Sequence, residues 1–143
     1  MNVPESLEGP RKLRIARAGV HQMYAHAVDD VPNEACGMFG GAGERVDTVY
    51  SLANADESPY NYAIDSRDQI KTIRAAEDAG LDITGCYHSH TRTDAYPSPT
   101  DVAQALYPEW IYALLSLKYE EPVLRAYRIV DEKIVEIPVV VEA

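Results

Sequence analysis

The stretch that most constrains the fold of this chain is "DITGCYHSH", residues 82–90, which ends in two histidines. Its alternation predicts a β-strand, and side chains two residues apart on a strand point to the same face. His88 and His90 therefore share a face, with ring nitrogens close enough to bind one ion. The loop "TRTDAYPSPTD" follows at once, with seven residues between the second histidine and Ser98 and two residues between Ser98 and Asp101.

Two histidines at this spacing can bind one zinc ion together, although the pair alone is weak evidence for a metal site. Catalytic zinc sites use three protein ligands and keep a fourth position for water. His88 and His90 supply two ligands, and Asp101 is the natural third because "PSPTD" can fold back as a turn that opens the next helix. A His-x-His pair alone also occurs as two polar residues at a strand end. The longer pattern is more specific and favours metal binding.

The rest of the chain predicts alternating strands and helices. Strands are predicted at 12–16, 34–41, 45–54, 82–90 and 110–119, with weak alternation at 58–65 and a last hairpin of 122–130 and 133–141. Helices are predicted at 17–30, 66–80 and 100–107. In the second helix Ser66 and Gln69 match a capping box, and Gly80 ends it. This succession predicts an α+β (mixed α/β) domain with a curved sheet between helices.

Length and charge limit the class of protein. The 143 residues fit one domain, which we expect over 12–143, after a loose N-terminal tail over 1–11. A net charge of −10 disfavours nucleic acid and anionic membrane surfaces as partners. No apolar run approaches the length of a membrane span, and the N-terminus lacks the apolar core of a signal peptide. We therefore expect a cytoplasmic protein, and whether it forms a homodimer is left open.

The extended motif resembles the signature of the JAMM (MPN+) zinc metalloproteases, in which an upstream glutamate completes the site. "PNEACGMFGG" is similar to the glutamate strand of that family, with Glu34 in the acidic position. The resemblance covers the chain from about residue 12 onward. It implies a JAMM/MPN, cytidine-deaminase-like three-layer domain with a curved, mostly antiparallel sheet flanked by helices. Thr91 stands where many relatives have proline, and Asn33 where they have aspartate; neither is a ligand position.

The resemblance also implies a role for each motif residue. His88, His90 and Asp101 would hold one Zn²⁺ ion per chain, with a bound water as the nucleophile. Glu34 would take the proton of that water and pass it to the leaving amine. Ser98 would donate a hydrogen bond to the oxyanion, and prolines on both sides restrict its backbone.

Several residues outside the motif are weaker candidates. Arg92 and Tyr96 lie in the motif loop and are candidates to contact substrate, as are Tyr60 and Tyr62, which would form a wall for an extended peptide. For each of them a solvated or ordinary strand position is the alternative. Cys36 and Cys86 share strand faces with Glu34 and His88, and we expect them to be free, buried thiols rather than ligands.

Four segments, 33–37, 87–91, 95–101 and 124–131, are most similar to the small bacterial Mec-type peptidases, which act on a ubiquitin-like sulfur-carrier protein. The chain has little room for the insertions of polyubiquitin-cleaving relatives. This implies a zinc-dependent peptidase that hydrolyses the amide after the carrier's C-terminal Gly-Gly, releasing cysteine. We expect the tail to add as a strand beside the catalytic strand.

Three alternatives follow from the same sequence. An isopeptidase that removes a ubiquitin-like modifier from protein lysines would cut a similar bond. A non-catalytic MPN scaffold is disfavoured, because all five motif positions are filled. A zinc nucleoside deaminase would carry H-x-E and PCxxC motifs, and this chain has neither.

Overall fold

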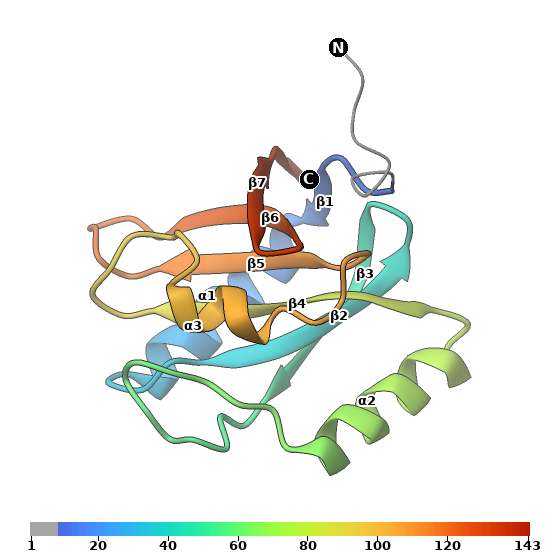
Figure 1. Cartoon of the computed structure of the whole chain (residues 1–143). Coiled ribbons are helices and arrows are strands. Elements are labelled where there is room, and N and C mark those ends of the chain that lie inside the picture. The colour runs from blue at the N-terminus through green and yellow to red at the C-terminus, as the bar shows by residue number, and fades with distance from the viewer. Residues whose placement is uncertain (1–8) are drawn as a thin grey trace.

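The computed structural model describes residues 9–143. The expected tail over 1–11 therefore lies mostly outside the described residues. The elements, shown in Figure 1, are β1 (Leu13–Ala16), α1 (Arg17–Asp30), β2 (Cys36–Ala42), β3 (Arg45–Leu52), α2 (Ser66–Asp78), β4 (Asp82–His90), α3 (Pro99–Gln104), β5 (Ile111–Ser116), β6 (Val123–Val130), β7 (Lys133–Ile137) and β8 (Val139–Glu142).

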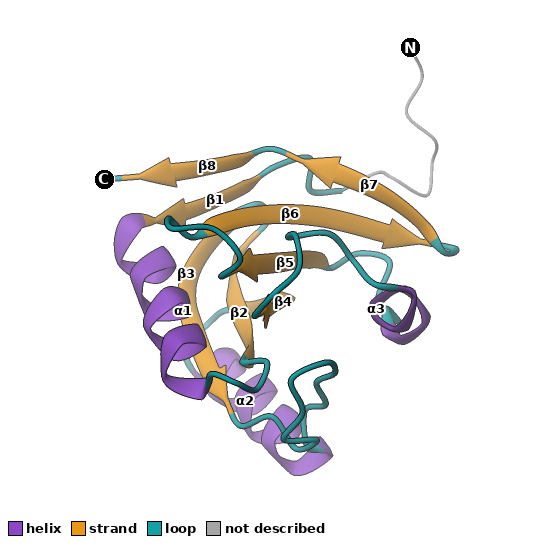
Figure 2. Ribbon diagram, turned by 90° about the vertical axis from the view of Figure 1, so that its left-hand side faces the viewer, coloured by secondary structure: helices purple, strands orange, loops and turns teal. Residues whose placement is uncertain are grey.

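The strands form one mixed sheet in the order β7-β6-β5-β4-β2-β3-β1-β8. Four pairs are antiparallel, namely β2–β3, β2–β4, β5–β6 and β6–β7. The β4–β5, β1–β3 and β1–β8 pairs are parallel. The sheet curves strongly, and Figure 2 shows β7 passing across the top into β8, which lies beside β1. The expected α+β domain with a curved sheet is confirmed.

Each face of the sheet carries its own core. Helix α1 covers the outer side, where Met23 packs against a cluster that includes Phe39 and Tyr87. Helices α2 and α3 lie on the other side, where Ile73 and Val102 pack against a second cluster of buried side chains. That cluster includes Met38, Cys86, Tyr112, Leu114 and Tyr127. The three-layer arrangement follows from strands that are apolar on both faces.

The pairing of β2 with β4 fixes the position of the motif. Cys36 lies opposite His88 and Gly37 opposite Tyr87. A side chain at Gly37 would meet the Tyr87 ring, because a Cβ built there lies 2.3 Å from a ring carbon. Glycine lets the ring lie flat over the neighbouring strand. This contact holds the register that brings the start of β2 next to the end of β4.

Residues 58–65, whose alternation is weak, form no strand, and backbone groups of Asn61 and Ala63 bond to the Asn54 side chain. The structure corrects three local expectations. The N-cap of α2 is Asp65, whose side chain accepts from Arg67 N at 2.9 Å, so the predicted Ser66–Gln69 capping box does not form. An aspartate one residue earlier is an equally good cap.

The other two corrections concern the sheet. The predicted strand 133–141 is divided at Pro138, and its second half crosses to pair with β1. Strand β4 is central, with β2 on one side and β5 on the other. Its backbone groups are already paired, so a substrate tail cannot add beside it as a further strand.

Candidate metal centre and active site

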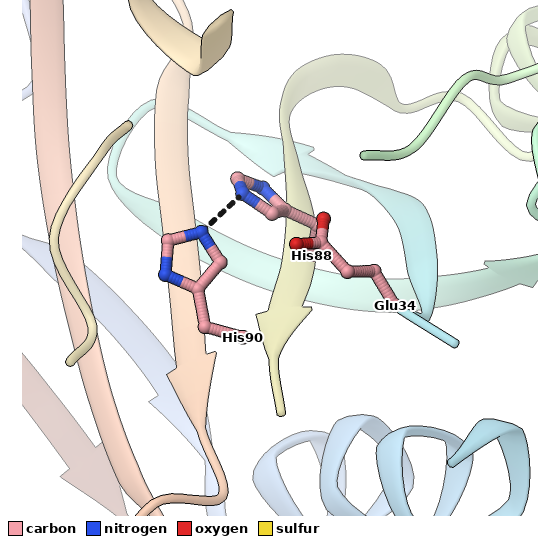
Figure 3. A group of neighbouring side chains, drawn as sticks. All are labelled: Glu34, His88 and His90. Atoms are coloured by element: carbon pink, nitrogen blue, oxygen red, sulfur yellow. Dashed lines mark hydrogen bonds between the residues drawn. The ribbon is translucent and has the colours of Figure 1, made fainter. Parts of the chain in front are cut away.

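The end of β4 brings the two histidines together as the alternation predicts. Both are buried, and their Nε2 atoms lie 3.2 Å apart. Figure 3 shows the two rings turned toward each other, with the Glu34 carboxylate close by. Ligand atoms of Glu34, His88 and His90 all lie within 4.8 Å of one another.

Asp101 completes a triangle of ligand atoms. Its Oδ2 lies 3.0 Å from His88 Nε2 and 3.1 Å from His90 Nε2. Ligand atoms around one tetrahedral zinc ion lie about 3.3 Å apart when each is 2.0–2.1 Å from the metal. The three edges of the triangle, 3.0 to 3.2 Å, are close to that spacing. The residues fit a His₂Asp site for a small, tetrahedral cation.

The first turn of α3 positions Asp101. Ser98 is the N-cap, and its Oγ accepts from Asp101 N at 3.1 Å. In return Asp101 Oδ2 accepts from Ser98 N at 2.9 Å. This reciprocal capping box explains the two-residue spacing between the motif serine and aspartate. It uses the serine oxygen as an acceptor, so the serine O–H stays available as a donor.

The loop between β4 and α3 orients His90. The His90 Nδ1 atom lies 2.8 Å from the carbonyl oxygen of Asp94, and a proton on Nδ1 leaves Nε2 with a lone pair for a metal. Three side chains from β5, the loop after it and β6 hold this loop. Ser116 Oγ donates to Thr93 O at 2.5 Å, Tyr119 donates to the Asp94 carboxylate, and Tyr127 donates to Ala95 O.

Glu34 lies two residues before β2 and is buried, with 4% of its surface exposed. Its backbone N donates to Ser58 O at 2.9 Å, and its carbonyl accepts from Asn54 Nδ2 at 2.9 Å. Within residues 9–143 its Oε1 atom is buried without a hydrogen-bond partner. A buried, unpaired carboxylate oxygen is costly, and its position beside the histidines gives it a natural partner in a water or substrate at this site.

Burial and neighbouring charges set the ionisation of the site. Burial raises the pKa of Glu34 to about 7, from an ordinary value of 4.5. Burial also lowers the pKa of His88, which favours its neutral form. Burial alone would raise the pKa of Asp101, but hydrogen bonds from both histidines hold that pKa well below its usual range. A neutral His88 and an ionised Asp101 are the forms that bind metal.

The pKa of His90 is raised, whereas that of His88 is lowered. Burial acts to lower its pKa, but hydrogen bonds to Asp101 and to the Asp94 carbonyl outweigh burial and raise it. Metal binding must therefore displace a proton that His90 holds more tightly than an ordinary histidine does.

The two cysteines are free and buried. Burial raises the pKa of both Cys36 and Cys86 to about 12. At neutral pH they are thiols, and the thiolate is the form that binds zinc. They belong to the packing beneath the site, as expected.

A pocket of about 250 Å³ opens beside Glu34, His90 and Ser98. Its other lining residues are Pro32, Pro59, Tyr60, Thr91, Arg92 and Thr93. The structure thus brings two of the four weaker candidates, Tyr60 and Arg92, to one pocket with the motif residues.

The other two candidates are placed differently. Tyr62 stacks on the His88 ring, with centroids 4.3 Å apart and planes at 24°, so it packs against a histidine of the candidate site. Tyr96 lies outside this pocket, against the edge of the Tyr127 ring.

Two positioning residues were missed by sequence reasoning. Asn54 is buried and ties together the Glu34 carbonyl and the loop that carries Tyr62. Ser89 points away from the metal ligands, but its Oγ accepts from Ala35 N at 2.8 Å and so fixes the backbone next to Glu34. A lone Asn or Ser carries no sequence signal for such a role, because both occur commonly in solvated loops.

Comparison with known proteins finds a matching family model and curated relatives that cover most of the chain. The family model for prokaryotic homologs of the JAB domain matches residues 17–130. The CysO-cysteine peptidase of Mycobacterium tuberculosis is 45% identical over 123 residues, which cover 84% of each chain. A probable TtuB-protein conjugate cleaving protease of Thermus thermophilus is 34% identical over 94 residues, covering 65% of this chain and 63% of its own.

A solved structure matches the whole architecture. The solution structure of a protein from Desulfitobacterium hafniense superimposes with a TM-score of 0.84 and 32% identity, covering 91% of this chain and 92% of that one. No helix among the described residues is long and apolar enough to cross a membrane.

Proposed function

The chain belongs to the prokaryotic homologs of the JAB domain, and we propose that it is a zinc-dependent peptidase acting on a ubiquitin-like sulfur-carrier protein. In this proposal it hydrolyses the amide after the carrier's C-terminal Gly-Gly, releases cysteine and regenerates the carrier. The observation that carries the proposal is the triangle of His88, His90 and Asp101 beside the buried carboxylate of Glu34. The 45% identity to a CysO-cysteine peptidase supports the choice of substrate.

His88, His90 and Asp101 would hold the zinc ion. When bound, zinc lowers the pKa of water from near 16 to about 7 and polarises a carbonyl group. Both histidines and the aspartate are fixed before the metal arrives, by the β2–β4 register, the Asp94 carbonyl and the α3 capping box. Little side-chain freedom is lost on binding, which favours affinity.

Glu34 is the general base and acid in this proposal. A carboxylate with a pKa of about 7 can accept a proton from water and give it back to an amine near neutral pH. A bound zinc ion would stabilise the ionised form and lower this pKa. The unpaired Oε1 atom faces no competing donor among the described residues, so the carboxylate is available to the attacking water.

Ser98 supplies the oxyanion donor. Its oxygen accepts from the Asp101 N–H, which leaves its hydroxyl proton available to donate to an acceptor in the pocket. Loss of one such donor typically lowers kcat by about 10²-fold or more.

The carrier tail would enter the pocket beside Glu34 and Ser98 rather than join the sheet, because β4 has partners on both sides. Glycines suit this route, because a tail without side chains can bring its backbone close to Glu34 and Ser98 in this pocket of about 250 Å³. Exposed Tyr60 would form part of the wall for this tail.

An isopeptidase is the second candidate function. It would remove a ubiquitin-like modifier from protein lysines with the same residues in the same roles. The similarity to the Thermus protease, whose name describes cleavage of protein conjugates, favours this alternative.

The test is intact-mass analysis of a ubiquitin-like carrier that bears a C-terminal cysteine. The carrier is incubated with the zinc-loaded protein, with and without chelator, beside a Glu34→Gln variant shown to bind zinc. We expect loss of the terminal cysteine that chelator abolishes and the variant lacks. An intact carrier in the presence of the zinc-loaded protein would contradict the proposed reaction, and cleavage of a lysine-linked conjugate in the same assay would favour the isopeptidase.

A further inference from the structure

We propose that Arg92 recognises the free α-carboxylate of the amino acid that hydrolysis releases. Arg92 would thereby select carriers bearing a single C-terminal amino acid over carriers joined to protein lysines. The inference rests on the proposed function, because it concerns the leaving group of that reaction. It goes further by assigning a residue that decides between the two substrate classes.

The first argument is the composition of the pocket. Three of its lining residues, Glu34, His90 and Ser98, belong to the site of reaction. Among its described lining residues, Arg92 is the one lysine or arginine. The whole chain carries a net charge of −10, and apart from the zinc ion of the proposed site Arg92 is the positive group that this pocket offers to a carboxylate.

The second argument is that Arg92 has no structural task in the described chain. It is exposed, it lies two residues after the end of β4, and within residues 9–143 its side chain forms no recorded ion pair or hydrogen bond. Arg14 pairs with Glu142 at 2.8 Å and Arg125 with Glu136 at 3.4 Å. The exposed Arg17, Arg67 and Arg74 are unpaired among the described residues as Arg92 is, but they do not line this pocket. The Arg92 fork is thus free to bind a ligand.

The third argument is the geometry of the leaving group. In a carrier that ends in one amino acid, the carboxylate carbon lies two bonds, about 2.5 Å, from the scissile nitrogen. A residue that reads this carboxylate must line the pocket that holds the base and the oxyanion donor, as Arg92 does. A lysine isopeptide has four methylenes on the scissile nitrogen and no carboxylate nearby.

Arginine also suits this ligand chemically. Its planar guanidinium can bind both oxygens of a carboxylate at once, and such charge-assisted pairs are stronger than neutral hydrogen bonds. Lysine would keep the charge but lose the paired geometry. A hydrogen bond to a charged group corresponds to a factor of about 10 to 100 in binding.

The experiment compares two substrates that differ only in charge. One is the carrier with a C-terminal cysteine, and the other is the same carrier with cysteine amide, which lacks the carboxylate. The ratio of kcat/KM for acid over amide is measured for the zinc-loaded native protein and for Arg92→Ala, Arg92→Lys and Arg92→Glu. Arg74→Ala, which removes an exposed arginine of α2 outside this pocket, is the matched control.

We expect the native protein to prefer the acid by about 10- to 100-fold. The ratio should fall to near 1 in Arg92→Ala, lie between in Arg92→Lys, drop below 1 in Arg92→Glu and stay native in Arg74→Ala. A native ratio near 1, or a ratio that Arg92→Glu leaves unchanged, overturns the assignment while the peptidase stands. Hydrolysis of neither substrate by zinc-loaded protein overturns both proposals.

Discussion

Single residues at this site are held in states that isolated side chains would not adopt. Glu34 is buried beside two histidines, and burial raises its pKa to about 7. Asp101 is buried as well, yet hydrogen bonds from His88 and His90 hold its pKa well below its usual range. Two buried carboxylates beside the same pair of histidines thus receive opposite pKa shifts, as the proposed roles of Glu34 as a base and Asp101 as a ligand require.

The raised pKa of Glu34 predicts a pH dependence of stability in the metal-free protein. The folded state keeps a proton that the unfolded chain releases above pH 4.5, so the stabilisation is present at low pH and is lost as pH rises toward 7. Glu34→Gln cannot ionise, so at pH 8 it should exceed the native protein in free energy of unfolding by about 1 to 3 kcal/mol. At pH 4.5 the two should be nearly equal.

Urea unfolding in chelator at both pH values measures this difference. Glu77→Gln, an exposed glutamate on α2, is the control that should show no such pH dependence. A constant difference between the native protein and Glu34→Gln at the two pH values would show that the folded-state pKa is ordinary.

At the scale of elements, the loop between β4 and α3 and the strand β6 together orient His90. The hydroxyl of Tyr127 on β6 holds Ala95 O, and the adjacent Asp94 carbonyl accepts from His90 Nδ1. Tyr127 and Ala95 are buried, so this contact is shielded from water. Strand β5 thus supports the histidines directly, by pairing with β4, and β6 supports His90 through the loop.

Tyr127→Phe should therefore weaken metal binding. Loss of the hydroxyl leaves the Ala95 carbonyl unpaired and loosens the loop, and we expect zinc affinity to fall by about 10-fold. Competition with a chelating dye measures it. Tyr112→Phe is a matched control, because the Tyr112 hydroxyl also bonds backbone groups, those of Tyr107, but not those of the motif loop. Equal zinc affinities in the two variants would argue against transmission through the loop.

Strand register gives a second prediction at this scale. Gly37→Ala places a methyl group against the Tyr87 ring and the Tyr50 carbonyl. The clash should lower the free energy of unfolding by about 1 to 3 kcal/mol. Denaturant unfolding measures it, with Gly43→Ala in the β2–β3 turn as a comparison that has open space but a positive φ of 59°. A smaller loss at Gly37 than at Gly43 would contradict the packing argument.

At the scale of the whole molecule, the last two strands of the chain lie at opposite edges of the same sheet. Strand β7 forms one edge and β8 the other, with Pro138 between them in sequence. β8 pairs in parallel with β1 along Leu13–Ala16, which covers an edge that would otherwise be open. The metal site lies on β4, several strands away from this closure.

Removal of residues 139–143 should therefore affect stability and association more than metal binding. Loss of the β1–β8 hydrogen bonds should lower the free energy of unfolding by about 2 to 4 kcal/mol, and the exposed β1 edge should promote aggregation. Zinc affinity of the folded fraction should stay within a few-fold of native. Urea unfolding measures the free energy of unfolding, light scattering measures aggregation, and dye competition measures zinc affinity. The substitution Val141→Ser at an exposed position is the control. A large loss of zinc affinity would show that closure also shapes the site.

The sequence by itself determined the local parts of this protein. Alternation along residues 82–90 placed His88 and His90 on one face, and "PSPTD" indicated a turn that opens the next helix, which begins at Pro99. Such features depend on neighbours within a few residues, so periodicity reveals them. Helix α1 and strand β4 have the predicted bounds for the same reason.

Tertiary structure alone decided the rest. The approach of Glu34 to the histidines, the burial that shifts its pKa, and the support from Asn54 and Ser89 all depend on contacts between segments distant in the chain. The central position of β4 and the crossing of β8 depend on strand order, which no local pattern encodes. Local preference sets which residues can form an element, whereas burial and pairing partners are properties of the assembled sheet.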